Sequence, residues 1–289
     1  MVLVVTFLVM SSAWLGWKYL HPLDKEAFPL ITSNDTTHEV SVVYINAGRA
    51  DSMLVKIDEH SYLVDTGLKS SVDQIEAVLA KYNVDKLDGI FLTHTHKDHI
   101  GGLKKIADKF DIGTLYSAEI SMNDKDGNNV IEQKADKAGV SLNKLTLGDK
   151  VLLADDVYFE VLGPIEYNDN DDNDNSLVLR MFVNGRTFLF AGDMQFAEEQ
   201  TLLDYGIDVS ADIYKVGNHG NPDATSEKFA QAVSPKIAVF TTDRSKDVDS
   251  ANETVKSYFR NADIYVTEDY DLGILVKVDE NGEIEVLEA

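Results

Sequence analysis

The stretch Thr93-His94-Thr95-His96-Lys97-Asp98-His99 holds four side chains of the kinds that bind divalent metal ions. It follows Gly89–Thr93, an apolar run that predicts a buried strand. His94 and His96 alternate along the extended chain, so both project from the same side. Three of the seven histidines in the chain lie here, which argues against an incidental polar turn. We therefore predict a site for two metal ions in this stretch.

Composition limits what such a site can be. The chain of 289 residues has no cysteine, which excludes thiolate metal ligands, disulfides and cysteine nucleophiles. Imidazole and carboxylate ligands favour zinc, with manganese as the alternative. The formal net charge is −24, whereas nucleic-acid-binding domains usually carry the opposite sign. Nucleic acid is thus a disfavoured partner, although two divalent cations would offset part of the charge.

The first residues differ from the rest of the chain. Residues 1–20 are apolar with one charge, at Lys18, and their length is close to the minimum for a membrane span. A signal peptide would need a basic start and a small-residue cleavage site, neither of which is clear here, and a buried core helix is a third reading. Residues 21–38 contain two prolines and predict a linker. We expect a membrane-anchored or secreted protein whose remainder acts outside the cytoplasm.

Residues 39–289 are expected to form one α/β domain. Strand-like runs at Val40–Ile45, Ser52–Ile57 and Ser61–Val64 precede a helix that we expect to begin with a capping box from Ser71 to Gln74. Apolar spacing after the histidines predicts a second helix up to Phe110. The second half repeats the alternation of strands and helices, so two sheets packed together with helices outside are expected. The acidic run Glu166–Asn175 lacks the glycine of a calcium loop and reads as a solvated loop.

The histidine stretch resembles the His-x-His-x-Asp-His signature of the metallo-β-lactamase superfamily. This resemblance implies a four-layer αββα sandwich and a ligand set in which His94 and His96 hold one ion. It further implies that Asp98, His99 and His219 hold the second ion and that Asp193 bridges both. Asp65, in the segment Val64–Gly67, resembles the strand-end aspartate that orients the metal-binding loop. Asp98 and Asp193 are the candidates for accepting a proton during the reaction.

Within the superfamily, the chain is most similar to the extracytoplasmic hydrolase domain of competence DNA-uptake channels (ComEC) and its relatives. Three segments carry this likeness: Asn46–Ser52, Asn175–Arg180 and Asn218–Gly220. The subgroup places an asparagine where other members have a further histidine ligand. The resemblance therefore implies Asn175 as a weak ligand or, with Ser176, as a group beside the ligands or the substrate.

The chain departs from that subgroup at three places. Arg49 and Ala50 replace glutamine and glycine in the first segment. Asn218 precedes His219 where the subgroup has two histidines, so the sequence leaves open which of these two positions faces the metal. The expected Gly-His-Pro segment is absent, and residues 241–244 read Thr-Thr-Asp-Arg instead.

These features predict a metal-dependent hydrolase, first of all a phosphodiesterase or related phosphoester hydrolase. Its substrate would be a small or polymeric phosphoester. One alternative is a hydrolase of lactams, lactones or thioesters, although a retained Asp193 argues against a true lactamase. The other alternative is a binding module with a degraded metal site, which the asparagine at position 218 would favour. Fold and superfamily alone do not fix the substrate.

Overall fold

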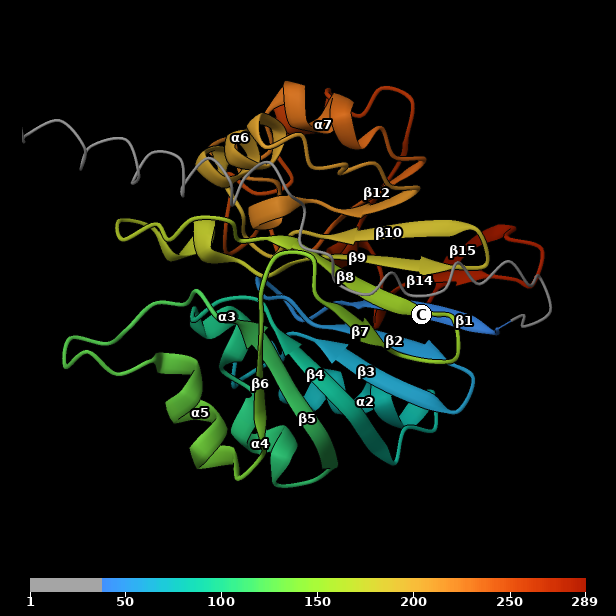
Figure 1. Ribbon diagram of the computed structural model, residues 1–289. Coiled ribbons are helices and arrows are strands. Elements are labelled where there is room, and N and C mark those ends of the chain that lie inside the picture. The colour runs from blue at the N-terminus through green and yellow to red at the C-terminus, as the bar shows by residue number, and fades with distance from the viewer. Residues whose placement is uncertain (1–37) are drawn as a thin grey trace, which may run out of the picture. The chain divides into compact units, whose positions relative to one another are not determined.

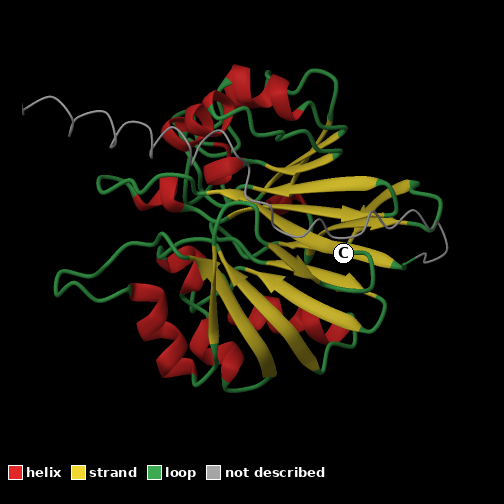
Figure 2. Cartoon of the chain, in the orientation of Figure 1, coloured by secondary structure: helices red, strands yellow, loops and turns green. Residues whose placement is uncertain are grey.

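Two β-sheets lie at the centre of the computed structural model, which describes residues 38–289 (Figures 1 and 2). The first sheet has eight strands in the order β15-β14-β1-β2-β3-β4-β5-β6. Its strands are β1 (Val40–Ile45), β2 (Met53–Ile57), β3 (His60–Val64), β4 (Lys86–Leu92), β5 (Asp111–Ala118), β6 (Leu142–Leu145), β14 (Gly273–Val278) and β15 (Ile284–Glu288).

The second sheet has seven strands in the order β13-β12-β11-β10-β9-β8-β7. Its strands are β7 (Lys150–Leu152), β8 (Tyr158–Gly163), β9 (Val178–Val183), β10 (Arg186–Phe190), β11 (Ile213–Lys215), β12 (Ile237–Phe240) and β13 (Asp263–Val266). In both sheets a run of neighbouring strands is parallel, from β3 to β6 and from β10 to β13. Loops that follow parallel strands meet at one edge of a sheet, which is where open α/β sheets place their binding sites.

Three apolar clusters bind the layers together. Aromatic side chains including Tyr44, Phe91, Phe159 and Phe190 fill the space between the sheets. A second cluster lies under the helices α2 (Val72–Lys81), α3 (Lys97–Ile100), α4 (Leu103–Ala107) and α5 (Val130–Ala138). A third lies under α6 (Phe196–Asp204), α7 (Glu227–Val233) and α8 (Glu253–Lys256). The helices thus cover the outer faces of two packed sheets, as the sequence predicted (Figure 2).

Several local predictions are wrong, for reasons the contacts explain. Ser71 precedes α2 but does not cap it through its side chain, because its hydroxyl donates to the carbonyl of Ala47 at 2.6 Å. The helix expected after the histidines is two short helices, α3 and α4, because the N–H of Gly102 donates to the carbonyl of Gly67 at 2.9 Å instead of to a carbonyl of the helix. Strands β5 and β6 and helix α5 were not predicted at all.

The acidic run Glu166–Asn175 is a solvated loop only in its first part, where Glu166, Tyr167, Asp169 and Asn170 are exposed. Its last residues form a short 3-10 turn, Asp172–Asn175, in which Asp172 and Asp174 are each only 4% exposed. Their carboxylates accept backbone N–H groups from two other loops, at Thr95 and at Gln195. These hydrogen bonds compensate for burial of the charged groups.

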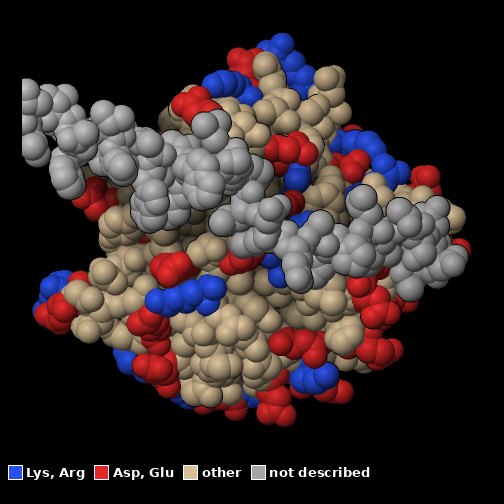
Figure 3. Space-filling view, viewed as in Figure 1, with Lys and Arg blue, Asp and Glu red and all other residues tan. Residues whose placement is uncertain are grey.

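Carboxylates are spread over much of the face in view, with smaller patches of Lys and Arg among them (Figure 3). This agrees with the excess of 50 acidic over 26 basic residues in the sequence. The predicted anchor, residues 1–20, and nearly all of the predicted linker, 21–38, lie outside the described residues. Among residues 38–289, no helix has the length and apolar character that a membrane crossing requires.

Candidate metal centre

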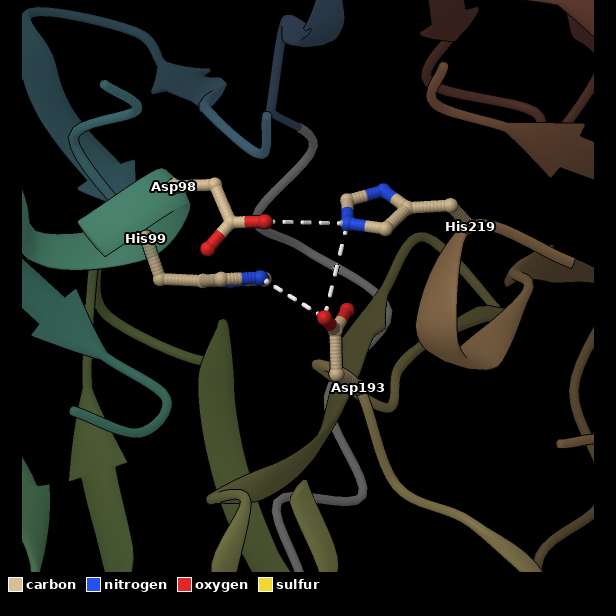
Figure 4. A group of neighbouring side chains, drawn as sticks. All are labelled: Asp98, His99, Asp193 and His219. Carbon is tan, nitrogen blue, oxygen red and sulfur yellow. Dashed lines mark ion pairs between the residues drawn. The ribbon is translucent and has the colours of Figure 1, made fainter. Parts of the chain in front are cut away.

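Four of the predicted ligands converge where loops from the two sheets meet (Figure 4). Asp98 and His99 come from α3, Asp193 from the turn after β10, and His219 from the turn after β11. One ligand atom from each of the four lies within 4.8 Å of all the others. The Asp193 carboxylate is at the centre, since its Oδ2 lies 3.0 Å from His99 Nε2 and 3.4 Å from His219 Nε2.

The other two predicted ligands lie beside this group. His94 is fully buried, and its Nε2 lies 4.0 Å from the same Oδ2 of Asp193. The exposed ring of His96 lies next to that of His94, with 4.7 Å between the ring centroids. Asp193 therefore lies near His94 as well as near Asp98, His99 and His219.

The histidine rings are oriented so that their Nε2 atoms point into the centre. His219 Nδ1 donates to the carbonyl of Thr241 at 2.8 Å, and His99 Nδ1 donates to Asp65 at 2.7 Å. A ring that donates through Nδ1 keeps a lone pair on Nε2 when it is neutral, which is the form that binds metals. The Nε2 atoms of His94, His99 and His219 are buried and have no hydrogen-bond partner among the described residues.

Oδ1 of Asp193 is buried without a hydrogen bond as well. Unpartnered nitrogen and oxygen atoms that face one another inside a protein are costly unless a ligand satisfies them. The donor set fits divalent ions that accept imidazole and carboxylate ligands, and His94, His96, Asp98, His99, Asp193 and His219 would hold them.

Asp65 orients the metal-binding loop through three contacts. Its Oδ1 accepts the N–H of Thr93 at 2.8 Å, and its Oδ2 accepts the Thr93 hydroxyl and His99 Nδ1. Because the Thr93 hydroxyl proton goes to Asp65, its oxygen is free to accept from His94 Nδ1, which lies 3.1 Å away. One buried carboxylate thus sets the orientation of two ligand rings.

Ser176 and Gly192 bring the β10 turn close to that loop. The Ser176 hydroxyl lies 3.4 Å from His94 Nδ1 and accepts the N–H of Asp193 at 3.1 Å. Gly192 has φ +53°, and a Cβ there would lie 2.8 Å from the Ser176 hydroxyl and 2.9 Å from Thr93. Only glycine fits this position, so Gly192 allows the turn that positions the Asp193 carboxylate.

Asn175 is not among the ligand atoms that converge. Its Oδ1 accepts the N–H of Asn168 at 2.9 Å, and its Nδ2 donates to the carbonyl of the same residue. Asn175 therefore braces the acidic turn, and Asp172 in that turn holds the metal-binding loop through the N–H and hydroxyl of Thr95.

His219, which follows Asn218, supplies one of the four converging ligand atoms. Both residues have positive φ values, 41° and 54°, so the chain turns sharply here and the two side chains leave it in different directions. We therefore expect Asn218→His to change metal affinity by less than about threefold, because surroundings that lack a direct contact usually contribute little. Calorimetric zinc titration of both proteins measures this, and a clear gain in affinity would show that position 218 faces the metal.

A buried ion pair beneath the centre was not predicted as part of the site. Lys215, the last residue of β11, is fully buried and forms an ion pair with Asp51, which is also fully buried. Lys215 Nζ donates to the carbonyl of Gly192 at 2.8 Å and lies 3.6 Å from Asp193 Oδ1. Asp51 in turn accepts the hydroxyl of Thr241 at 2.5 Å. The pair thus links the turns that carry Asp193 and His219.

A family model of the metallo-beta-lactamase superfamily matches residues 45–241, more than half of the chain. The chain belongs to the metallo-β-lactamase superfamily. It is 27% identical to ComE operon protein 3 of Bacillus subtilis (strain 168) over 265 residues, which are 86% of this chain and 33% of that protein. It is 28% identical to Competence protein ComA of Neisseria gonorrhoeae over 225 residues, which are 77% of this chain and 30% of that protein.

The likeness to competence proteins that the sequence predicted is therefore confirmed, and the chain spans about a third of the length of these two relatives. Among solved structures, the metallo-beta-lactamase fold protein YhfI from Bacillus subtilis superposes with a TM-score of 0.56. The superposition covers 83% of this chain and 99% of that one at 15% identity, so it supports the fold alone.

Protons and metal ions would compete for the predicted ligand side chains. Burial lowers the pKa of His219, but the carboxylates of Asp193, Asp51 and Asp98 together raise it by more, to about 9. His99 behaves alike: burial lowers its pKa, and Asp193 and Asp65 raise it well above the ordinary value. Burial raises the pKa of Asp98, but His219 and His99 together lower it by more than burial raises it, so this carboxyl stays ionised.

Metal affinity is consequently expected to fall as the pH is lowered. Below pH about 9, His219 is protonated in the metal-free protein, so an ion has to displace that proton. The apparent zinc Kd should rise about tenfold per pH unit for each proton displaced between pH 8 and pH 6. Competition titrations with a zinc indicator at several pH values measure this slope, and an affinity independent of pH would contradict the assignment of His219 as a ligand.

Proposed function

We propose that the chain is a phosphodiesterase or a related phosphoester hydrolase that works with two divalent ions, zinc first and manganese second. The position of Asp193 carries this proposal. Its Oδ2 lies 3.0 Å from His99 Nε2, 3.4 Å from His219 Nε2 and 4.0 Å from His94 Nε2, which suits a carboxylate shared by two ions. A shared carboxylate is typical of two-metal sites that cleave phosphoesters.

The ions would supply a water of lowered pKa and positive charge to stabilise the oxygens of the transition state. The protein's part is to hold the ligand atoms in place. Asp65 fixes the rings of His94 and His99, and the Thr241 carbonyl fixes the ring of His219. We propose Asp98 and Asp193 as the proton acceptors, and Asp98 is the one of the two that is only partly buried and so reaches solvent.

Hydrolysis of a carbonyl substrate remains the first competing function, because two ions also polarise a lactam, lactone or thioester. The second is binding by a degraded site. The sequence left open whether His219 is a ligand, and in the structure His219 lies in the converging group. Its Nε2 and those of the other histidines lie beside a central carboxylate, which argues against a degraded site.

A small substrate panel tests the proposal. The purified full chain, loaded with zinc or with manganese, is assayed on bis-(p-nitrophenyl) phosphate, a thioester and nitrocefin. We expect phosphodiester hydrolysis to be the fastest of the three by kcat/KM. Faster thioester or nitrocefin hydrolysis would favour the carbonyl substrates, and metal binding without any hydrolysis would favour the binding module.

We further propose that residues 1–20 anchor the chain and that residues 39–289 form one catalytic domain outside the cytoplasm. The support is the apolar run with its single charge, which is long enough to span a bilayer. The full chain should therefore sediment with membranes and be released by detergent, whereas residues 36–289 should stay soluble. Fractionation with immunodetection decides this, and a soluble full chain with its amino terminus intact would refute the anchor.

A further inference from the structure

A pocket of about 820 Å³ opens directly beside the metal centre, and Asp98 is part of its wall. The rest of the wall comes from segments far apart in the sequence. These are the turn after β1, the segment leading into α2, and the loop after β12. Asp98 is also one of the four converging ligands, so a molecule bound at the ions would extend into this pocket.

The charge of the pocket differs from that of the chain as a whole. Arg49, Lys97 and Lys246 line it, against two carboxylates, Asp98 and Asp243. The formal net charge of the chain is −24, so basic residues in the majority are unusual here. Asp98 would moreover face the ions, which leaves one lining carboxylate against three cations.

Two of these cations are free to meet a ligand. Lys97 and Lys246 are exposed, and within residues 38–289 neither forms an ion pair. The guanidinium group of Arg49 is held in place by one hydrogen bond, in which its Nε donates to Asp247 at 2.8 Å. The remaining guanidinium donors of Arg49 make no hydrogen bond within the described residues. Polar neutral groups, including Ser70 and Gln74, complete the wall.

We infer that this pocket binds a second phosphate group of the substrate, one link along the chain from the phosphoester that is cleaved. The inference rests on the proposed phosphodiesterase function and adds to it a preference for substrates with more than one phosphate. Guanidinium and ammonium groups bind phosphate through charge-assisted hydrogen bonds. The negatively charged surface of the chain repels anions. A cationic pocket next to the ions would raise the local concentration of an anionic substrate at the site.

Kinetics on matched substrate pairs test the inference. The thymidine dinucleotide TpT is compared with pTpT and TpTp, which add a terminal phosphate at either end. A propanediol phosphodiester with and without a terminal phosphate provides the same comparison without bases. We expect the added phosphate, at one end at least, to raise kcat/KM of the metal-loaded full chain by about tenfold, chiefly through KM.

Two variants and one control locate the effect. Lys246→Gln and Lys97→Gln should each reduce the gain from the added phosphate by about threefold or more. Lys137→Gln, an exposed lysine on α5 that does not line the pocket, should retain the gain in full. Gain with both the nucleotide and the propanediol pair identifies phosphate alone as the ligand; gain with the nucleotide pair only identifies a nucleic acid as its source.

A binding measurement separates this inference from the proposed function. Both pTpT and TpTp are made with an uncharged methylphosphonate at the internal linkage, which the enzyme cannot cleave as a phosphodiester, and the Kd of each is determined by calorimetry. Lys246→Gln should weaken binding by about threefold or more and Lys137→Gln should not. If no phosphodiester is cleaved, the proposed function fails while this binding still decides the inference. Equal Kd values for both variants, or no gain from a terminal phosphate in the wild type, would overturn it.

Discussion

Asp193→Asn is expected to lower phosphodiesterase activity by at least ~10²-fold, the scale seen when one key electrostatic element of an active site is removed. The amide has the shape of the carboxylate but no negative charge, so it cannot be shared by two cations. In the wild type, Oδ2 of Asp193 lies close to His99 and His219. The variant should therefore also have a lower affinity for an ion between these residues. Steady-state kinetics and elemental analysis of the same preparations measure both effects.

Asp204→Asn is a matched control for this substitution, since Asp204 is an exposed carboxylate at the end of α6, away from the converging ligands. It should retain full activity. His219→Ala gives a second comparison, because a lost ligand is partly offset by mass action and its activity should recover as metal is added. The hydrolase proposal fails if metal-loaded wild type and Asp193→Asn are equally inactive on every substrate class.

Lys215→Met is expected to cost about 3–5 kcal/mol of the free energy of unfolding, measured without metal in the presence of EDTA. Methionine fits the space of the buried lysine but leaves Asp51 as a buried charge without its partner. A domain of this size loses roughly 2–4 °C in Tm per kcal/mol, so thermal unfolding should shift by roughly 10 °C.

Lys236→Met is the control, because Lys236 also pairs with an aspartate, Asp212, but its side chain is 59% exposed. A surface ion pair contributes only about 0–1 kcal/mol, so this variant should be nearly as stable as the wild type. Asp51→Asn added to Lys215→Met should restore part of the loss, since no unpaired charge then remains. A single Lys215→Met variant as stable as Lys236→Met would show that the buried pair contributes nothing.

The sequence predicted the metal-binding loop because its ligands are neighbours in the chain and directly follow an apolar strand. Asp193 and His219 were assigned only through their resemblance to superfamily motifs, since no local pattern shows that two turns from the second sheet reach the first. The ion pair of Lys215 with Asp51 joins a strand of the second sheet to the turn between β1 and β2 of the first, and no sequence periodicity reports such a contact. A lysine next to Ile213, Tyr214 and Val216 was the available sign of a buried cation.

The strands and the helix that the sequence did not predict were missed for a different reason. Strand β6 and helix α5 expose many polar side chains, so their apolar pattern is short. Pairing with β5 determines the structure of β6, and α5 packs against α4. The acidic run at 166–175 was read as solvated because its composition is polar. The carboxylates of Asp172 and Asp174 are buried because the loops at Thr95 and Gln195 present N–H groups to them, which only the fold brings near.

The ligands come from both sheets, with Asp98 and His99 after β4 of one and Asp193 and His219 after strands of the other. Bound ions would therefore act as a clasp that fastens the two halves of the sandwich at this edge. Binding that is restricted to the folded state adds about 4 kcal/mol at a metal concentration 1,000 times the Kd. When metal is scarce, the two halves would be held together less firmly and catalysis would stop. The lifetime of the folded protein would then depend on the metal concentration.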